Sequence, residues 1–298
     1  MKKKNRIALF TFLFLGFLGQ SSISAADDID RSPYTMNVNG LFIQMDVQPV
    51  IDKTSLLIPI RTLSSIGLTY NWDSSSQSVT IRNKEADEII LTVNSKVSNK
   101  NGISSDMPVP VQSKDGRVLV PIRFVTESLG YHVQYETFRK MIFIRSKDYQ
   151  FDTNAIADND LAAARRASIA LPLTASFKPL NFSTLKYHRY VFPSGRADTY
   201  MFSDGFTSSI VDIKDGIASV VGQYVTGGRS DIVYKAGNVT GGNLADPVLK
   251  PYLFDRVSFY LEEATSITNY LDSEGNLHAF STPVTIYSDI IQATPNNT

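Results

Sequence analysis

Two stretches of this 298-residue chain repeat one another, and the repeat limits the folds open to the N-terminal half. Residues 56–67 read LLIPIRTLSSIG, and residues 118–130 read VLVPIRFVTESLG, with one extra residue before the final glycine. After the glycines the copies stay in step, at 68–72 (LTYNW) with 131–135 (YHVQY) and at 79–82 (VTIR) with 142–145 (IFIR). Two ordered copies predict two copies of one structural unit.

Each copy is predicted to form a strand, a short helix and a hairpin of two strands. The apolar runs before Pro59 and Pro121 are typical of buried strands, and the prolines fit the first turn of a helix, where the missing N–H costs nothing. Gly67 and Gly130 are expected to end those helices, because glycine readily adopts the left-handed conformation. We expect Trp72 to pack in the core of its unit.

A further strand over residues 89–93 joins the two units, which together predict an α+β domain over residues 35–147. The paired units resemble the copper amine oxidase N-terminal domain family, also called stalk domains. The resemblance implies a non-catalytic α+β module of exported and cell-surface proteins of Gram-positive bacteria, whose ligand is generally not established. The second copy departs from the family pattern at Tyr135, where tryptophan is usual, and at Phe138 and Arg139 in the turn.

The residues do not support amine oxidase chemistry. In the enzymes that give the family its name, the cofactor derives from tyrosine in T-x-x-N-Y-[DE], and three histidines, two of them spaced H-x-H, bind copper. The nearest string here, residues 266–271, reads SITNYL, and the three histidines, His132, His188 and His278, stand alone. The chain has no cysteine, which excludes thiol catalysis, Cys-ligated zinc and disulfides. We expect no metal site and no cofactor.

The N-terminus has the pattern of an export signal. A basic start is followed by an apolar run over residues 7–18 and by small residues at Ser24 and Ala26, which predicts a signal peptide over 1–26 and a linker over 27–34. The apolar run is shorter than the ~20 residues that a membrane-spanning helix needs. We therefore expect a secreted, extracellular protein that is either released or associated with the cell wall. We expect no membrane-spanning segment after the signal peptide is cleaved.

The charge of the exported chain does not favour nucleic acid as a partner. Removing the leader takes away four of the 29 basic residues and no acidic residue, which leaves 25 basic residues against 29 acidic ones. Phosphate binding needs a basic surplus.

The C-terminal half, residues 152–298, is predicted to be a mainly antiparallel β domain with one N-terminal helix over 155–170. Short runs of Tyr, Phe, Val and Ile alternate with Gly-containing turns, which is typical of a meander. The predicted strands cover 185–192, 197–203, 207–213, 217–226, 230–235, 256–263, 265–271, 277–281 and 284–291, with a loop over 237–251. No family is identified for this half.

The candidate binding residues are Tyr187, His188 and Tyr190, on a predicted strand where aromatic and basic residues alternate. They suit a groove for an anionic glycan, and His188 suits a general base. The alternative is a strand face that exposes polar residues. We assign no catalytic residue. A hydrolase would need two of the following residues to converge in one pocket: His188, Asp204, Asp212, Asp231, Glu262 and Glu263.

The leading hypothesis is a secreted, non-enzymatic binding or structural protein of the cell envelope, whose partner is cell-wall polysaccharide or another envelope protein. Exposed aromatic residues would stack on sugar rings, although the same residues also suit core packing. The alternative is a hydrolase of envelope polymers with its site in the C-terminal half. Assembly through exposed sheet edges is a third hypothesis.

Overall fold

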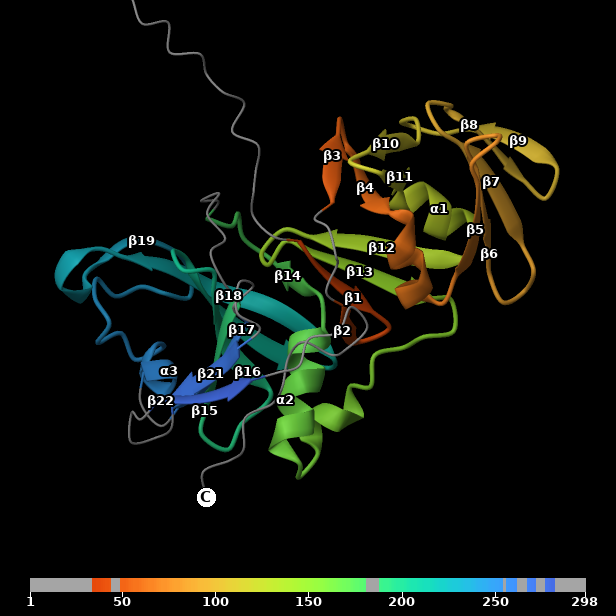
Figure 1. Ribbon diagram of the computed structural model, residues 1–298. Helices are drawn as coiled ribbons and strands as arrows, with labels where there is room; N and C mark the ends of the chain where they lie inside the picture. The colour runs from red at the N-terminus through yellow and green to blue at the C-terminus, as the bar shows by residue number, and fades with distance from the viewer. Residues whose placement is uncertain are drawn as a thin grey trace, which may run out of the picture. The chain divides into compact units, whose positions relative to one another are not determined.

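The computed structural model describes residues 34–43, 49–180, 188–253, 256–261, 267–271 and 277–281. These residues form mostly β strands with a few short helices, as the α+β prediction states (Figure 1). The predicted leader and the predicted strand over 284–291 lie outside the described residues. In the described part of the chain, no helix is long and apolar enough to cross a membrane.

Three sheets form the repeat module, the name used here for residues 35–147. The first has the order β12-β13-β1-β2, the second β10-β11-β4-β3, and the third β5-β6-β7-β8-β9. The strands are β1 (Thr35–Val38), β2 (Leu41–Ile43), β3 (Val50–Asp52), β4 (Ser55–Pro59), β5 (Thr69–Asp73), β6 (Ser78–Arg82), β7 (Glu88–Thr92), β8 (Val97–Lys100), β9 (Ile103–Asp106), β10 (Gln112–Lys114), β11 (Arg117–Pro121), β12 (Tyr131–Glu136) and β13 (Met141–Ser146). The first strand, β1, pairs parallel with the last, β13, so the module closes on itself.

The predicted short helices are present in both copies but differ in type. In the first copy η1 (Ile60–Ile66) is a 3₁₀ helix, and in the second α1 (Ile122–Ser128) is an α-helix. Pro59 and Pro121 end the preceding strands and stand one position before the helices, rather than inside the first turn. Gly67 has φ +83° and its N–H donates to the carbonyl of Ser64, which confirms its role at the end of η1.

The hairpins that follow the helices share their turn conformation. β5 pairs antiparallel with β6, and β12 pairs antiparallel with β13. Gln77 (φ 49°) and Lys140 (φ 50°), which occupy equivalent positions in the two copies, both adopt the left-handed conformation just before the second strand. The order of elements thus recurs, but β5 and β12 belong to different sheets. Duplication of the whole unit stays a prediction from the sequence.

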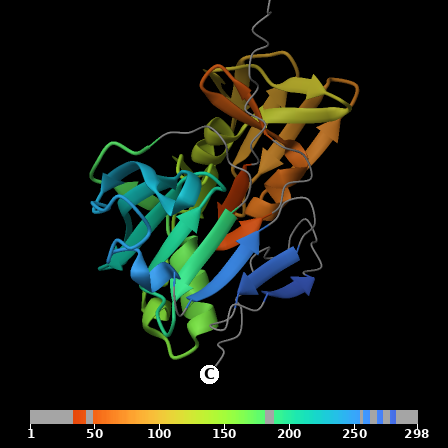
Figure 2. The ribbon, with the colours of Figure 1, turned by 90° about the vertical axis from the view of Figure 1, so that its left-hand side faces the viewer.

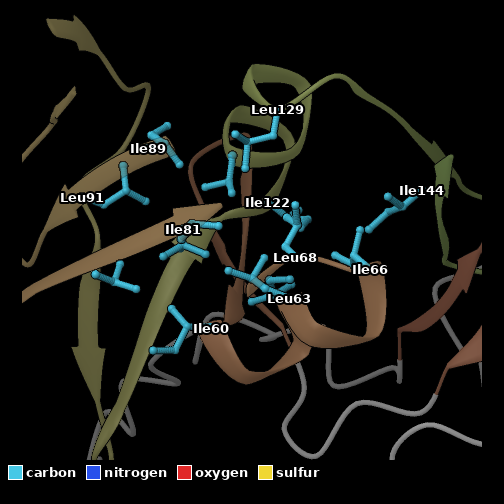
Figure 3. Close-up of a cluster of buried hydrophobic side chains, with 14 of the residues drawn as sticks. Ile60, Leu63, Ile66, Leu68, Ile81, Ile89, Leu91, Ile122, Leu129 and Ile144 are labelled. Carbon is cyan, nitrogen blue, oxygen red and sulfur yellow. The ribbon is translucent and has the colours of Figure 1, made fainter. Parts of the chain in front are cut away.

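A large hydrophobic core lies in the described part of the repeat module, beside a smaller cluster of Leu57, Val109 and Leu119. Side chains from η1, β6, β7, α1 and β13 converge on the large core (Figure 3). The labelled members are Ile60, Leu63, Ile66, Leu68, Ile81, Ile89, Leu91, Ile122, Leu129 and Ile144, and each is at most 8% exposed. Matched apolar positions of the two copies, such as Leu63 and Val125, therefore belong to the same core.

The strand β13 is buried on both faces. Ile142 and Ile144 point into the core of the module, whereas Met141 and Phe143 belong to a second core. Neighbouring residues of a strand point to opposite faces, so this unbroken apolar run serves two cores at once. Phe42 of β2 joins the second core, whose remaining members come from residues beyond 150. Hydrophobic packing therefore crosses the predicted boundary near residue 150, and that boundary stays a prediction.

A seven-stranded sheet dominates the C-terminal half (Figure 2). Its strands are β14 (Leu173–Ala175), β15 (His188–Pro193), β16 (Thr199–Ser203), β17 (Ser208–Lys214), β18 (Ile217–Thr226), β19 (Ile232–Gly237) and β20 (Arg256–Leu261). The run from β15 to β18 is an antiparallel meander, as the spacing of turn signals predicts. β14 adds parallel to β18, which the sequence analysis did not predict.

The predicted helix over 155–170 is divided in two. A 3₁₀ helix, η2 (Asn154–Ala157), precedes α2 (Leu161–Ala170). Asp158 is extended, and the side chains of Asp158 and Asp160 accept backbone N–H groups of Asp160 and Ala163. Aspartate side chains favour such turns and caps over the helix interior, which explains the break. The remaining elements are η3 (Gly228–Ser230), α3 (Lys250–Leu253), β21 (Ile267–Leu271) and β22 (Leu277–Ser281).

A buried ion pair joins the β12–β13 turn to the end of α2. The Arg139 Nε atom donates to the Glu136 carboxylate at 2.6 Å, and both side chains are almost completely buried. The Arg139 Nη1 and Nη2 atoms donate to the carbonyl oxygens of Ile169 and Leu171, each at 2.7 Å. Every arm of the guanidinium therefore has an acceptor.

Replacing Arg139 by methionine is expected to lower the free energy of unfolding by about 3–5 kcal/mol, because it leaves a buried carboxylate without its cation. Urea unfolding of the purified protein measures the change. Arg196→Met is the control: Arg196 pairs with Asp198 at 2.9 Å, but its side chain is 52% exposed, so a loss of about 0–1 kcal/mol is expected. Equal losses in the two variants would contradict the structural role of Arg139.

Substitutions at Gly237 and Gly102 can separate two causes of destabilisation, which are steric overlap of a new Cβ atom and backbone strain at positive φ. Both have positive φ, at +64° and +86°. A Cβ atom at Gly237 would overlap the carbonyl oxygen of Val221, whereas a Cβ atom at Gly102 would meet nothing within 4 Å. We expect Gly102→Ala to lower the free energy of unfolding by about 1 kcal/mol and Gly237→Ala by about 2–4 kcal/mol. Matching denaturation midpoints for the two variants would show that the contact at Gly237 is absent.

Candidate functional site

The strand that carries the predicted binding residues is present, but Tyr190 faces the protein interior. Tyr190 is completely buried, with its ring centroid 5.8 Å from that of Tyr200 and 5.4 Å from that of Phe202. Burial raises the pKa of the Tyr190 hydroxyl to about 12. Tyr187 lies outside the described residues, and the backbone of His188 starts β15 opposite Leu261. Binding by Tyr187 and His188 stays a prediction.

The acids considered for a hydrolase do not meet in the clefts described below. Asp204 is buried, and its carboxylate accepts hydrogen bonds from the backbone N–H groups of Phe206 and Thr207. This pattern is typical of an aspartate that stabilises a turn. The pKa of Asp204 is raised by burial. The Asp212 carboxylate accepts a hydrogen bond from the Thr199 hydroxyl at 2.9 Å. Asp231 lies between η3 and the first residue of β19. Glu262 and Glu263 lie outside the described residues.

A cleft with a volume of about 260 Å³, called the polar cleft here, lies in the repeat module. It forms where the β1–β2 turn, the β6–β7 connection, the end of α1 and the end of β13 meet. Its lining consists of Asn39, Ile66, Asn83, Lys84, Glu85, Asp87, Leu129, Gly130, Tyr131, Ser146, Lys147 and Asp148. Most of these side chains are polar or charged, and Ile66 and Leu129 supply an apolar floor.

Hydrogen bonds between the surrounding segments fix the walls of the polar cleft. The Asn83 side-chain amide donates to the Leu129 carbonyl at 3.2 Å, which ties the β6–β7 connection to the end of α1. Asn101 donates to the Asp87 carboxylate at 2.8 Å, and the Ser146 backbone N–H donates to the Asn39 side chain at 2.9 Å. A ligand would meet walls that are already in place.

The electrostatics of the polar cleft combine both signs of charge. Hydrogen bonds from Asn101 and Asn83 hold the pKa of Asp87 below its usual value, so Asp87 carries its negative charge firmly. Burial, with a smaller contribution from the negative charge of Glu85, raises the pKa of the Tyr131 hydroxyl. The phenol stays protonated and keeps its capacity to donate. Lys84 and Lys147 contribute positive charge to the same lining.

A second, wider cleft of about 490 Å³ lies beside α2. Its lining combines apolar side chains of η2, α2 and β17 with the Arg196–Asp198 ion pair. Asp158 and Asp215 also line it. The guanidinium here is already paired with a carboxylate, which leaves little for an anionic ligand to gain.

Two aromatic residues, Tyr70 and Trp72, stand on the edge strand β5 and are called the aromatic rim here. They are opposite Ile81 and Val79 of β6, so their side chains lie on the core face of the sheet. Tyr70 is nevertheless 36% exposed and Trp72 37% exposed, because β5 has a strand neighbour on only one side of its sheet. The expectation that Trp72 packs in the core holds only in part, since about a third of it meets solvent.

The sequence analysis missed the polar cleft because its residues come from the ends of elements far apart in the chain. Asn39, Asn83 and Tyr131 share no motif, and their approach depends on the parallel pairing of β1 with β13. Asn83 and Asp87 are residue types that commonly form turns, and the Asp87 backbone N–H does donate to the Asn83 side chain in such a turn. In the described part of the chain, no group of three or more His, Asp or Glu side chains is placed to hold a metal ion.

Comparison with known proteins identifies one part of the chain. No curated protein matches the sequence. A family model does match, over residues 37–144, which lie within the 35–147 predicted from the repeat. The match includes both copies of the repeat and most of the residues that line the polar cleft. Residues 37–144 are thus similar to the copper amine oxidase N-terminal domain family, as the repeated motifs predicted.

Proposed function

We propose that this chain is an exported, envelope-associated protein that binds cell-wall polysaccharide through the repeat module and performs no catalysis. Export is supported by the basic, apolar and small-residue pattern of residues 1–26. A non-catalytic role for the repeat module is supported by its match to a domain family whose members are stalk-type appendages. In this proposal the two repeat units descend from one duplicated stalk unit.

The aromatic rim is the observation that carries the binding proposal. Tyr70 and Trp72 are two residues apart on one strand, so their side chains leave the same face, from backbone positions about 7 Å apart along the strand. Indole and phenol rings offer rigid apolar faces with polar tips, which suits the apolar faces and hydroxyl rims of sugar rings. The neighbouring Asn71 and Asp73 are also exposed, on the opposite face of the strand.

The surroundings of the aromatic rim support a surface role. Asp73 accepts the Ser75 backbone N–H and the Ser75 and Ser76 hydroxyls, and these bonds hold its pKa at about 2. The hairpin turn beside Trp72 is therefore firmly ordered although it is exposed. A rigid aromatic platform loses little conformational entropy on binding. If the partner is another envelope protein, it would bind to the same edge strand, β5.

Trp72→Ala is expected to weaken co-sedimentation of the purified protein with isolated cell walls by about fivefold or more, because a stacking surface is lost. Tyr234→Ala is the matched control, since Tyr234 is 53% exposed on β19 and belongs to a different sheet. Walls treated with protease separate the two partners: binding that survives indicates polysaccharide, and binding that is lost indicates an envelope protein. Absence of binding to untreated walls would overturn the proposal.

Expression of the full chain in a Gram-positive host is expected to yield extracellular or wall-associated protein whose first residue is Asp27. N-terminal sequencing of the exported protein gives the cleavage position directly. Replacing Ser24 and Ala26 together by lysine should leave the uncleaved precursor with the cells, because the peptidase reads small residues at these positions. Efficient release of that variant at the same position would contradict the assigned site.

A further inference from the structure

Four exposed charged side chains line the polar cleft. Lys84, Glu85, Lys147 and Asp148 all line it and are exposed at its margin. Within the residues that the structure describes, none of the four makes a hydrogen bond or an ion pair. Their charges are therefore available to a ligand, unlike that of Asp87, which its asparagine neighbours already engage.

The balance of charges selects the class of ligand. With Asp87 included, the lining carries two ammonium groups and three carboxylates. A simple anion would meet the carboxylates, and a simple cation would meet the lysines, so each would lose by repulsion much of what it gains by attraction. A molecule that carries a carboxylate and an ammonium group together can place each beside the opposite charge.

The size of the polar cleft narrows the choice further. Its volume of about 260 Å³ lies below the range of about 300–1,000 Å³ that is usual for pockets of drug-sized ligands. A dipeptide of two glycines is small enough for such a space. The ordered walls and the Tyr131 hydroxyl, which stays protonated, give the peptide group of such a ligand a donor to meet.

We propose that the polar cleft binds a small zwitterion of amino-acid to dipeptide size. The ligand carboxylate lies between Lys84 and Lys147, and the ligand ammonium group lies beside Glu85 and Asp148. This site is separate from the aromatic rim, so loss of wall binding and loss of zwitterion binding are independent outcomes. The binding energy comes from charge-assisted hydrogen bonds at a partly enclosed surface.

The test compares glycylglycine with two blocked forms by NMR titration of the purified protein. N-acetylglycylglycine lacks the ammonium group, and glycylglycine amide lacks the carboxylate. We expect glycylglycine to shift resonances of the cleft residues and each blocked form to bind about tenfold more weakly or worse. Equal binding of all three, or no binding of any, overturns the proposal.

Variants test which charges are used. The double variant Lys84→Gln with Lys147→Gln should weaken glycylglycine binding by about tenfold or more, and Lys114→Gln, on the exposed strand β10, should leave it unchanged. All three lysines lie at the surface, so unchanged thermal unfolding is expected and serves as the check on folding. Unchanged affinity in a folded double variant contradicts the assignment.

Discussion

The pair between Arg139 and Glu136 is the interaction on which the two halves of the structure depend. Removing two charges from water costs several kcal/mol, and good geometry offsets that cost only when all of their donors and acceptors are engaged. Arg139 meets this condition by donating to Glu136 and to the carbonyls of Ile169 and Leu171. These carbonyls lie at the C-terminal end of α2, where the helix dipole is negative and favours a cation. The β12–β13 turn and the end of α2 therefore stabilise each other through the Arg139 side chain.

The residues at this junction differ from those at the matching positions of the first copy of the repeat. Glu136 is equivalent to Asp73 of the first copy, and each carboxylate accepts a backbone N–H within its own turn. Arg139 replaces Ser76, and in β13 Phe143 replaces Thr80. Ser76 is exposed and Thr80 partly exposed, whereas Arg139 is buried and Phe143 packs in the second core. The departure of the second copy from the family pattern at Phe138 and Arg139 is thus the mark of the junction.

Local patterns predicted local structure well, and long-range pairing was beyond them. The glycine at the end of η1 and the meander from β15 to β18 follow from residue type and spacing, so the sequence was sufficient for both. The parallel pairing of β1 with β13 depends on contacts about 107 residues apart, for which a single sequence has no signal. The alternation of aromatic and basic residues around Tyr190 is typical of a strand with one exposed face. In the structure both faces of β15 are covered. Periodicity alone cannot distinguish a strand with one exposed face from a strand that is covered on both.

The two candidate sites in the described residues lie in the repeat module, whereas the residues predicted from the sequence lie in the C-terminal half. The sequence placed binding in the C-terminal half, because aromatic and basic residues alternate around His188. In the structure, aromatic residues there build the core in which Tyr190, Tyr200 and Phe202 pack together. The aromatic rim and the polar cleft both lie in the repeat module, where β5 is an edge strand and four chain segments meet. Phe143 packs in one core with residues of the C-terminal sheet, and the edge strand β5 of the module carries the partly exposed Tyr70 and Trp72.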